Sequence, residues 1–253
     1  MIPAITIVCD TVSLWYGDFR ALDRVSMTVP EGGIVAMIGP SGCGKSTLLR
    51  CMNRMNDAPN VRVTGSLHVA GYDTTSSTTD VLALRRDVGM VFQRPNPLPM
   101  SIRDNVLFGV RLHSRPLSSA DSDVLLESSL KDVGLWESVK DRLNAPGESL
   151  SLEGRQKLCI ARLLPLKPKV LLMDEPCSAL DPEGIEAVEE LMARLKGRYT
   201  QVVVTHNMQQ ARRVSDTCVF LYMGELVEAR STADLFTNPR DLRTARYVEG
   251  RYG

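Results

Sequence analysis

The spacing of hydrophobic and polar residues near the N-terminus predicts short strands. Three stretches separated by turn residues have partly alternating polar and apolar positions, namely Ile5–Val8, Val12–Tyr16 and Val25–Val29. Such alternation is typical of strands with one buried and one exposed face. We therefore expect a small antiparallel sheet in this part of the chain.

A second pattern follows, in which short apolar runs alternate with helical segments. Ile34–Ile38 leads into a glycine-rich turn and then into a helix-prone segment, Lys45–Asn53. Further candidates for buried strands are Val88–Phe92, Val170–Met173 and Gln201–Val204. Strands that alternate with helices in this way predict an α/β fold with a largely parallel sheet.

The region between residues 94 and 165 has helical rather than alternating spacing. A proline-rich stretch leads into helix-like segments at Ser101–Val110, Ser119–Val133 and Leu152–Leu164. A further helix is expected at Pro182–Gly197, with proline in its first turn and glycine at its end. We expect one domain over residues 1–253, in which 1–93 and 166–253 form the core and 94–165 form an inserted helical subdomain.

Composition narrows the class of protein. The chain has 253 residues, 43% of them hydrophobic, which is enough to bury a core without disulfides or metals. Its 30 Lys and Arg balance 30 Asp and Glu, so no net charge favours binding to nucleic acid. The 6 cysteines are scattered without metal-ligand spacing, and we interpret them as reduced thiols. Neither a secretory signal nor an apolar run of about 18 residues is evident, so any role at a membrane would need a partner.

The strongest chemical signal is the segment Gly39-Pro-Ser-Gly-Cys-Gly-Lys-Ser46, which follows a predicted strand and precedes a predicted helix. It fits the pattern G-x-x-x-x-G-K-S of a phosphate-binding loop. In such a loop the glycines let backbone N–H groups face phosphates, Lys45 reaches the β- and γ-phosphates, and Ser46 binds Mg²⁺. The candidate nucleotide-binding residues of this segment are Gly39, Pro40, Ser41, Gly42, Cys43, Gly44, Lys45, Ser46 and Thr47.

Two carboxylates come directly after the apolar run Val170–Met173. Asp174 is suited to bind Mg²⁺, and Glu175 is suited to polarise an attacking water molecule. Sheets of this type bind ligands at the carboxyl ends of their strands. An Asp-Glu pair alone is more often a helix cap, and it is the glycine-rich loop earlier in the chain that favours catalysis.

Together these segments resemble the ATP-binding subunits of ABC transporters. Gly39–Ser46, Gln93, Asp174–Pro176, Ser178–Asp181 and Val204–His206 follow the order and kind of spacing of ABC-type ATPases, and the resemblance covers essentially the whole chain. It implies an ABC-type P-loop ATPase fold, with ATP and Mg²⁺ as cofactors.

The resemblance also implies roles for single residues. Gln93 would sense the γ-phosphate, Asp181 would lie in a loop that crosses the dimer, and His206 would hold the γ-phosphate and water in register. Tyr16 would stack on adenine, and Ser151 would reach the ATP of the opposite subunit. Taken singly, several of these have simpler explanations, such as a helix N-cap for Asp181 or core packing for Tyr16. The candidate residues are, for catalysis, Lys45, Gln93, Glu175 and His206 and, for Mg²⁺, Ser46, Gln93 and Asp174.

Several segments more narrowly resemble the ATPase of the bacterial phosphate importer. They are Asn53–Asp57, Phe92–Pro97, Pro99–Asn105, Leu158–Arg162, Met173–Pro182, Thr205–Gln210 and Ala245–Tyr252. This implies phosphate uptake by an ATP-dependent homodimer on the cytoplasmic face of the cell membrane, with two integral membrane permease subunits, an extracytoplasmic phosphate-binding protein and no nucleic acid. None of these residues would contact the cargo, so its identity rests on resemblance alone.

One segment departs from the family pattern. ABC ATPases have Leu-Ser-Gly-Gly-Gln before the helix that contains Leu158–Arg162, whereas the ungapped register here is Leu150-Ser-Leu-Glu-Gly154. In the family mechanism this signature closes over the ATP of the opposite subunit. Leu152 would obstruct close backbone approach there, and Glu153 would place a carboxylate near a polyanion.

The departure leaves alternatives open. Closure and turnover could be weakened, the chain could be a regulatory or structural subunit that binds ATP without useful turnover, or Glu153 could simply lie in the first turn of a helix with a shifted backbone. A soluble ABC ATPase of DNA maintenance or translation is less favoured, because sustained heptads and net positive charge are both lacking.

Overall fold

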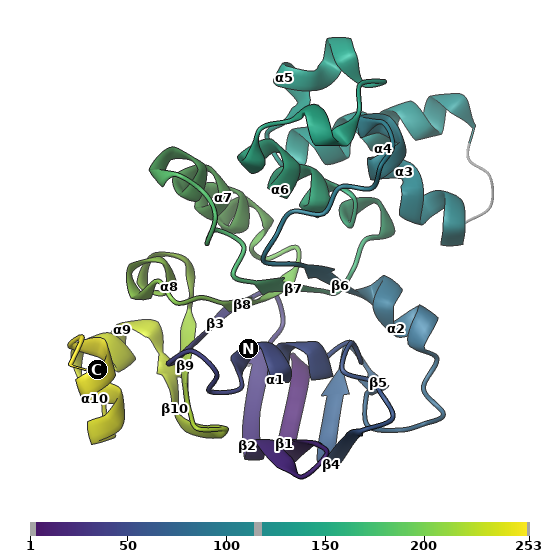
Figure 1. Ribbon diagram of the computed structural model, residues 1–253. Coiled ribbons are helices and arrows are strands. Elements are labelled where there is room, and N and C mark those ends of the chain that lie inside the picture. The colour runs from purple at the N-terminus through teal and green to yellow at the C-terminus, as the bar shows by residue number, and fades with distance from the viewer. Residues whose placement is uncertain (1–3, 114–117, 252–253) are drawn as a thin grey trace.

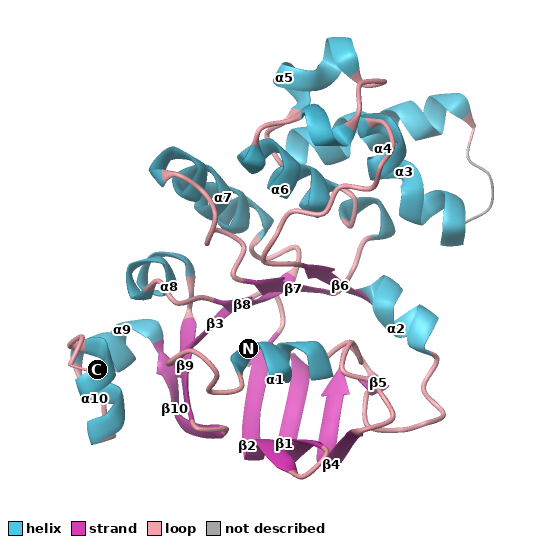
Figure 2. Ribbon diagram, viewed as in Figure 1, coloured by secondary structure: helices cyan, strands magenta, loops and turns pink. Residues whose placement is uncertain are grey.

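The computed structural model describes residues 4–113 and 118–251, and within these ranges the strands form two sheets (Figures 1 and 2). The first is antiparallel, in the order β2-β1-β4-β5, with strands β1 (Ile5–Tyr16), β2 (Phe19–Pro30), β4 (Val61–Val69) and β5 (Tyr72–Asp73). The second has the order β10-β9-β3-β8-β7-β6, with strands β3 (Ile34–Ile38), β6 (Val88–Val91), β7 (Val170–Asp174), β8 (Thr200–Val204), β9 (Thr217–Tyr222) and β10 (Glu225–Ser231). Its neighbouring strands are parallel except β9 and β10. The predicted fold class is confirmed.

Helices lie on both faces of the mixed sheet. They are α1 (Lys45–Cys51), α2 (Val81–Asp87), α3 (Ile102–His113), α4 (Ser119–Asp132), α5 (Trp136–Val139), α6 (Leu152–Ala161), α7 (Pro182–Leu195), α8 (Met208–Val214), α9 (Thr232–Thr237) and α10 (Leu242–Val248), with short 3₁₀ turns at Lys140–Arg142, Gly147–Ser149 and Leu164–Leu166. Figure 1 shows α3 to α6 grouped beyond the mixed sheet, away from the antiparallel one. These helices come between β6 and β7 in the chain. The subdomain boundaries at residues 94 and 165 stay a prediction.

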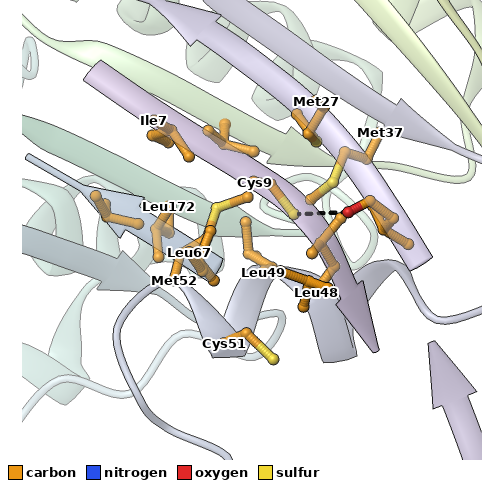
Figure 3. Packing of buried hydrophobic residues seen from close by; sticks show 14 of the residues in the cluster. Ile7, Cys9, Met27, Met37, Leu48, Leu49, Cys51, Met52, Leu67 and Leu172 are labelled. Atoms are coloured by element: carbon orange, nitrogen blue, oxygen red, sulfur yellow. Dashed lines mark hydrogen bonds between the residues drawn. The ribbon is translucent and has the colours of Figure 1, made fainter. Parts of the chain in front are cut away.

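Residues of the mixed sheet alternate between its two faces, and their side chains pack in separate hydrophobic clusters. Leu172 of β7 and Val202 of β8 pack with α1, in a cluster that the antiparallel sheet completes. Leu171 and Val203 face the opposite way and pack with α7 and the helices that follow β6. Figure 3 shows part of the first cluster, with Leu48 and Leu49 of α1 and Met52, which follows the helix, packed among Ile7, Cys9 and Leu67. The helix that follows the glycine-rich loop is therefore held by apolar side chains from both sheets.

The N-terminal strand is longer than the sequence predicts. The expected strands Ile5–Val8 and Val12–Tyr16 are one strand, β1, whose pairing with β4 shifts register between Asp10 and Ser13. Thr11 has a left-handed backbone (φ 50°) at this irregularity. Gly65 of β4 meets the bulge so closely that a Cβ there would lie 2.5 Å from the Thr11 carbonyl oxygen. The polar residues that suggested a turn thus form a bulge within a continuous strand.

Two helices end earlier than expected. The segment Lys45–Asn53 is helical only to Cys51, and the segment Leu152–Leu164 only to Ala161. Pro165 lies in the 3₁₀ turn that follows α6, where its missing N–H removes a helical hydrogen bond. No helix within the described residues is long and apolar enough to cross a membrane. Two sequence interpretations involve residues outside the described ranges. The expected absence of a secretory signal includes residues 1–3, and the resemblance of Ala245–Tyr252 to phosphate importers includes Tyr252.

Candidate functional site

The register of the mixed sheet brings the candidate residues to one edge. Val91 of β6 pairs with Met173 of β7, so Gln93 and Glu175 each lie two residues beyond a paired position. Asp174 pairs with Val204 of β8, and Val204 in turn pairs with Met37 of β3. Because these strands are parallel, the segments that follow their carboxyl ends meet at the same edge.

The loop between β3 and α1 requires glycine at two positions. At Gly39 (φ 149°) a Cβ would lie 2.1 Å from the Leu221 carbonyl oxygen. At Gly44 (φ 105°), which precedes the first residue of α1, a Cβ would lie 2.8 Å from a methyl carbon of Leu22 and 2.9 Å from the Ala21 oxygen. The loop therefore packs against β2 and β9 with no room for side chains at these points.

Lys45 is held across this loop. Its ammonium donates to the carbonyl oxygens of Gly39 and Pro40, both at 2.8 Å, and only 4% of the residue is exposed. Cys43 lies against it, and burial raises the pKa of the Cys43 thiol although the neighbouring ammonium acts in the opposite direction. Cys43 is buried beside the Lys45 ammonium and is not a reactive thiolate.

Asp174 at the end of β7 is bound by two residues of α1. The Ser46 hydroxyl donates to Oδ1 at 2.6 Å, and the Arg50 guanidinium donates to Oδ2 at 3.3 Å. Ser46 and Arg50 are one turn apart, so both face the same carboxylate. Arg50 was not among the sequence-predicted residues, although its i, i+4 spacing from Ser46 is a signal from which it could have been found.

The Glu175 carboxylate, just after β7, contacts residues that follow the two neighbouring strands. Gln93, which follows β6, donates from Nε2 to Oε2 at 3.0 Å, and His206, which follows β8, contacts Oε1 through Nε2. The backbone of Glu175 is left-handed (φ 49°), and its N–H donates to the Val204 oxygen at 2.9 Å. Non-glycine residues with such backbones cluster at functional sites, because their strain persists only where surrounding contacts fix it.

A cavity of about 160 Å³ connects the loop with this carboxylate. It is lined by Ser41, Gly42, Gly44, Lys45, Ser46, Thr47, Glu175 and His206. A Cβ at Gly42 would meet open space, so the loop leaves the cavity free on that side. The donor set fits a nucleotide phosphate, with Lys45 as the cation and Glu175 opposite it.

The same residues fit Mg²⁺. Within the described residues no preformed cluster of three or more His, Cys, Asp or Glu could hold a metal. Mg²⁺ typically binds through one or two carboxylates, water and substrate phosphates rather than in an all-protein cage. Asp174 and the Ser46 hydroxyl supply oxygen ligands of that kind, 2.6 Å apart beside the loop.

The other candidate residues lie outside this cavity. Tyr16 ends β1 and donates to Asn56, whose amide donates to the Thr47 oxygen, so an indirect contact joins the ring to the first turn of α1. Asp181 caps α7 by accepting from the Gly184 N–H at 2.8 Å, which is the simpler explanation for this residue. Ser151 caps α6 and accepts from the Gly154 N–H at 3.1 Å. Their roles toward a nucleotide stay predictions.

The segment Leu150–Gly154, which departs from the family pattern, includes the start of an ordinary helix. Leu152 is the first residue of α6 and is 41% exposed, while Glu153 lies in the first turn. The Glu153 carboxylate pairs with the Lys157 ammonium at 2.5 Å, one turn later. Lys157 was not singled out from the sequence, and its i, i+4 spacing from Glu153 is the signal that could have found it.

Comparisons with known proteins show what the chain as a whole is similar to. A family model described as ABC transporter matches residues 22–178. The chain is similar to a bacterial Atm1-family ABC exporter solved with ATP bound, at 26% identity and a TM-score of 0.76, over 100% of this chain and 44% of the exporter chain. It is also similar to the ATP-binding cassette MJ0796, solved as a dimer in a post-hydrolysis state with ADP and Pi, at 28% identity and a TM-score of 0.76, over 89% of this chain and 98% of that one. The chain thus spans less than half of the exporter and almost all of the isolated cassette.

Proposed function

This chain belongs to the ABC transporter family, and on that premise we propose that it is the ATP-hydrolysing subunit of an importer of inorganic phosphate. The observation that supports hydrolysis most directly is the position of Glu175. Its carboxylate is held by Gln93 and His206 and lines the same cavity as Lys45. A carboxylate so placed can accept a proton from water that attacks the terminal phosphate.

Each residue of the site has a distinct task in this proposal. Lys45 exchanges the carbonyl oxygens of Gly39 and Pro40 for phosphate oxygens. Ser46 and Asp174 hold Mg²⁺, which supplies charge neutralisation between the phosphates. Gln93 and His206 orient the Glu175 carboxylate toward water. The regulatory alternative is not favoured, because the residues expected for hydrolysis are present and adjoin one another.

The assembly and its location are also part of the proposal. The dimeric state of the related cassette supports a homodimer that closes on ATP. We place this dimer on the cytoplasmic face of the cell membrane, under two permease subunits served by an extracytoplasmic phosphate-binding protein. Residues 94–165 would form the helical subdomain, and the Gln93–Val110 region would pass movement to the permeases. One matched relative is an exporter, so import and phosphate rest on the sequence resemblance to phosphate importers.

Hydrolysis is tested by steady-state ATP turnover of the wild-type chain, Glu175→Gln and Glu190→Gln. Glu190 is an exposed residue of α7 and provides a matched change of carboxylate to amide. We expect Glu175→Gln to lower turnover by at least about 100-fold, a typical contribution of a general base, while Mg-ATP binding persists. Equal turnover by Glu175→Gln and Glu190→Gln would exclude Glu175 as the base.

Cargo and direction need the assembled transporter. The chain is purified with its permease partners and reconstituted into vesicles together with the extracytoplasmic phosphate-binding protein, and transport of radiolabelled phosphate is compared with that of sulfate. ATP-driven movement of phosphate, and not of sulfate, away from the ATP-binding side supports export, and movement toward that side supports import. ATP hydrolysis without phosphate transport in either direction would reject phosphate as the cargo.

A further inference from the structure

Arg50 holds one side of the Asp174 carboxylate. The Ser46 hydroxyl donates to Oδ1 at 2.6 Å, whereas the Arg50 guanidinium lies 3.3 Å from Oδ2. Both partners belong to α1, and of the two only Ser46 lines the cavity beside the phosphate loop. The two carboxylate oxygens therefore have different surroundings. Oδ1 lies beside a residue of the cavity, and Oδ2 lies beside a cation that approaches from outside the cavity lining.

The two members of this ion pair differ in burial. The Asp174 side chain is 5% exposed, and the Arg50 side chain is 47% exposed. A carboxylate removed from water is costly unless a positive charge and hydrogen bonds compensate it. The guanidinium keeps its contact with solvent and loses little hydration in forming the pair. Asp174 therefore depends on Arg50 more than Arg50 depends on Asp174.

The other cation of the site is bound elsewhere. Lys45 donates its ammonium to the carbonyl oxygens of Gly39 and Pro40, both at 2.8 Å. Within residues 4–113 and 118–251, Arg50 is the one side chain that forms an ion pair with Asp174. When no metal is bound, Arg50 is thus the counter-charge of this buried carboxylate.

A divalent cation at Asp174 has to compete with this counter-charge. Asp174 and Arg50 together carry no net charge, so most of the attraction that the carboxylate alone would exert on a metal ion is cancelled. Mg²⁺ usually binds through one or two carboxylates together with water and substrate phosphates. The phosphates of a nucleotide would supply both the missing negative charge and the missing oxygen ligands. Metal affinity should therefore be low for the chain alone and rise when nucleotide is present.

We propose that Arg50 is a positioning residue for the metal site, and that its charge delays Mg²⁺ binding until nucleotide is present. By holding Oδ2, Arg50 keeps Oδ1 beside Ser46, and it compensates the buried carboxylate while the metal is absent. The inference rests on the proposed function, since it concerns the Mg²⁺ of the same site. The chain thus takes up metal together with nucleotide rather than before it.

The test compares the wild-type chain with Arg50→Gln, Arg50→Lys and Arg198→Gln. Arg50→Gln removes the charge, and Arg50→Lys keeps it. Arg198 is 50% exposed and pairs with Asp132 at 3.1 Å, so its variant is a matched loss of a half-exposed arginine from an ion pair elsewhere. Mn²⁺ serves as the probe, and its binding is measured by electron paramagnetic resonance with and without ADP. Thermal unfolding of each protein is measured in EDTA and at saturating Mn²⁺ and ADP.

We expect Arg50→Gln to bind Mn²⁺ at least about tenfold more tightly than wild type when ADP is absent, because a nearby positive charge has been removed. Arg50→Lys should stay within about threefold of wild type, and Arg198→Gln should match it. A tenfold change corresponds to about 1.4 kcal/mol, or about 3–6 °C in Tm for a chain of this size. The Tm of Arg50→Gln in EDTA should fall by this amount, and the difference from wild type should disappear at saturating Mn²⁺ and ADP.

The result that would overturn the inference alone is an unchanged Mn²⁺ affinity of Arg50→Gln without ADP, while ADP still promotes Mn²⁺ binding to both proteins. A fall in Tm that Mn²⁺ and ADP do not reverse would also overturn it, since Arg50 would then have a purely structural role. If Arg50→Gln is unfolded in EDTA, recovery of the folded state on addition of Mn²⁺ and ADP supports the inference, and failure to recover contradicts it. If the wild-type chain binds no Mn²⁺ even with ADP, the proposed function fails first and the inference fails with it.

Discussion

Replacing Lys157 with glutamine should expose a negative charge at the dimer interface of the proposed ATPase. Lys157 is one turn from Glu153 on α6, and its ammonium lies 2.5 Å from the carboxylate. The Lys157 side chain is 10% exposed and that of Glu153 is 36% exposed, so the pair lies where the helix meets solvent. In the proposed dimer this end of α6 faces the ATP of the second copy. Lys157 would then neutralise the carboxylate that stands where the family has glycine.

The size of the effect follows from Coulomb's law. An unpaired carboxylate about 8 Å from a phosphate charge, at an effective dielectric constant of about 20, is repelled by about 2 kcal/mol. That energy corresponds to about 30-fold in rate if it opposes closure on the transition state. The Lys157 side chain is largely buried, so losing the pair should lower the free energy of unfolding by about 1–3 kcal/mol, with a corresponding fall in Tm.

A double-mutant cycle separates charge from structure. ATP turnover and ATP-driven dimerisation are measured for the wild type, Lys157→Gln, Glu153→Gln and the double variant. We expect Lys157→Gln to be about 30-fold slower, Glu153→Gln to match or exceed wild type, and the double variant to resemble Glu153→Gln. The defect of Lys157→Gln should shrink at high salt because the charges are partly exposed.

Two outcomes would refute this reasoning. If Lys157→Gln turns over like wild type, the Glu153 charge does not reach the phosphates in the closed dimer. If Lys157→Gln and the double variant are equally slow, Lys157 supports the fold of α6 rather than neutralising Glu153.

Three further predictions concern stability and reactivity. Gly39→Ala should lower the free energy of unfolding by about 1–3 kcal/mol and abolish ATP binding, as measured by denaturant unfolding and nucleotide titration, because the new Cβ meets the Leu221 oxygen at 2.1 Å. For Glu228, burial raises the pKa but backbone hydrogen bonds from Arg240 and Asp241 outweigh it, so the folded-state pKa lies below its ordinary value. The stabilisation from ionised Glu228 is therefore present at neutral pH and is lost as pH falls below about 4.5. We expect Glu228→Gln to lower the free energy of unfolding by about 2 kcal/mol at pH 7. This difference from wild type should shrink in acid. Burial raises the pKa of Cys51 to about 12, so this thiol should resist a thiol reagent at about pH 8 until the protein is unfolded.

The sequence was most informative where chemistry and strand ends coincide. The glycine-rich loop was predictable because its pattern admits few side chains, and the loop does pack too closely for a Cβ at Gly39 and Gly44. The position of Asp174 and Glu175 followed from the apolar run before them. Their hydrogen-bond partners did not follow, because pairing of Glu175 with both Gln93 and His206 depends on the register of three strands.

Long-range packing explains most of what was missed. Strands β4, β5, β9 and β10 and helices α2, α8, α9 and α10 were not predicted, since most are short and several mix polar with apolar positions. Glu228 is an example, because it is a charged residue within a strand and is buried only because later backbone N–H groups satisfy it. Tyr247 likewise stacks on Phe220 only when the C-terminal helix folds back onto β9.

The Glu175 carboxylate is sensitive to displacement of either of its partners, Gln93 and His206. Gln93 follows β6 and begins the segment that leads to α3, whereas His206 follows β8 and precedes α8. Both contact Glu175, whose left-handed backbone leaves it little freedom to follow if either partner moves. A displacement of the helices after β6 would therefore break the bond from Gln93 before it shifted Glu175, and the carboxylate would turn toward His206 and away from its position for water. In the proposed transporter, movement of the helical region would thus control hydrolysis through a single hydrogen bond, with no need for β7 itself to move.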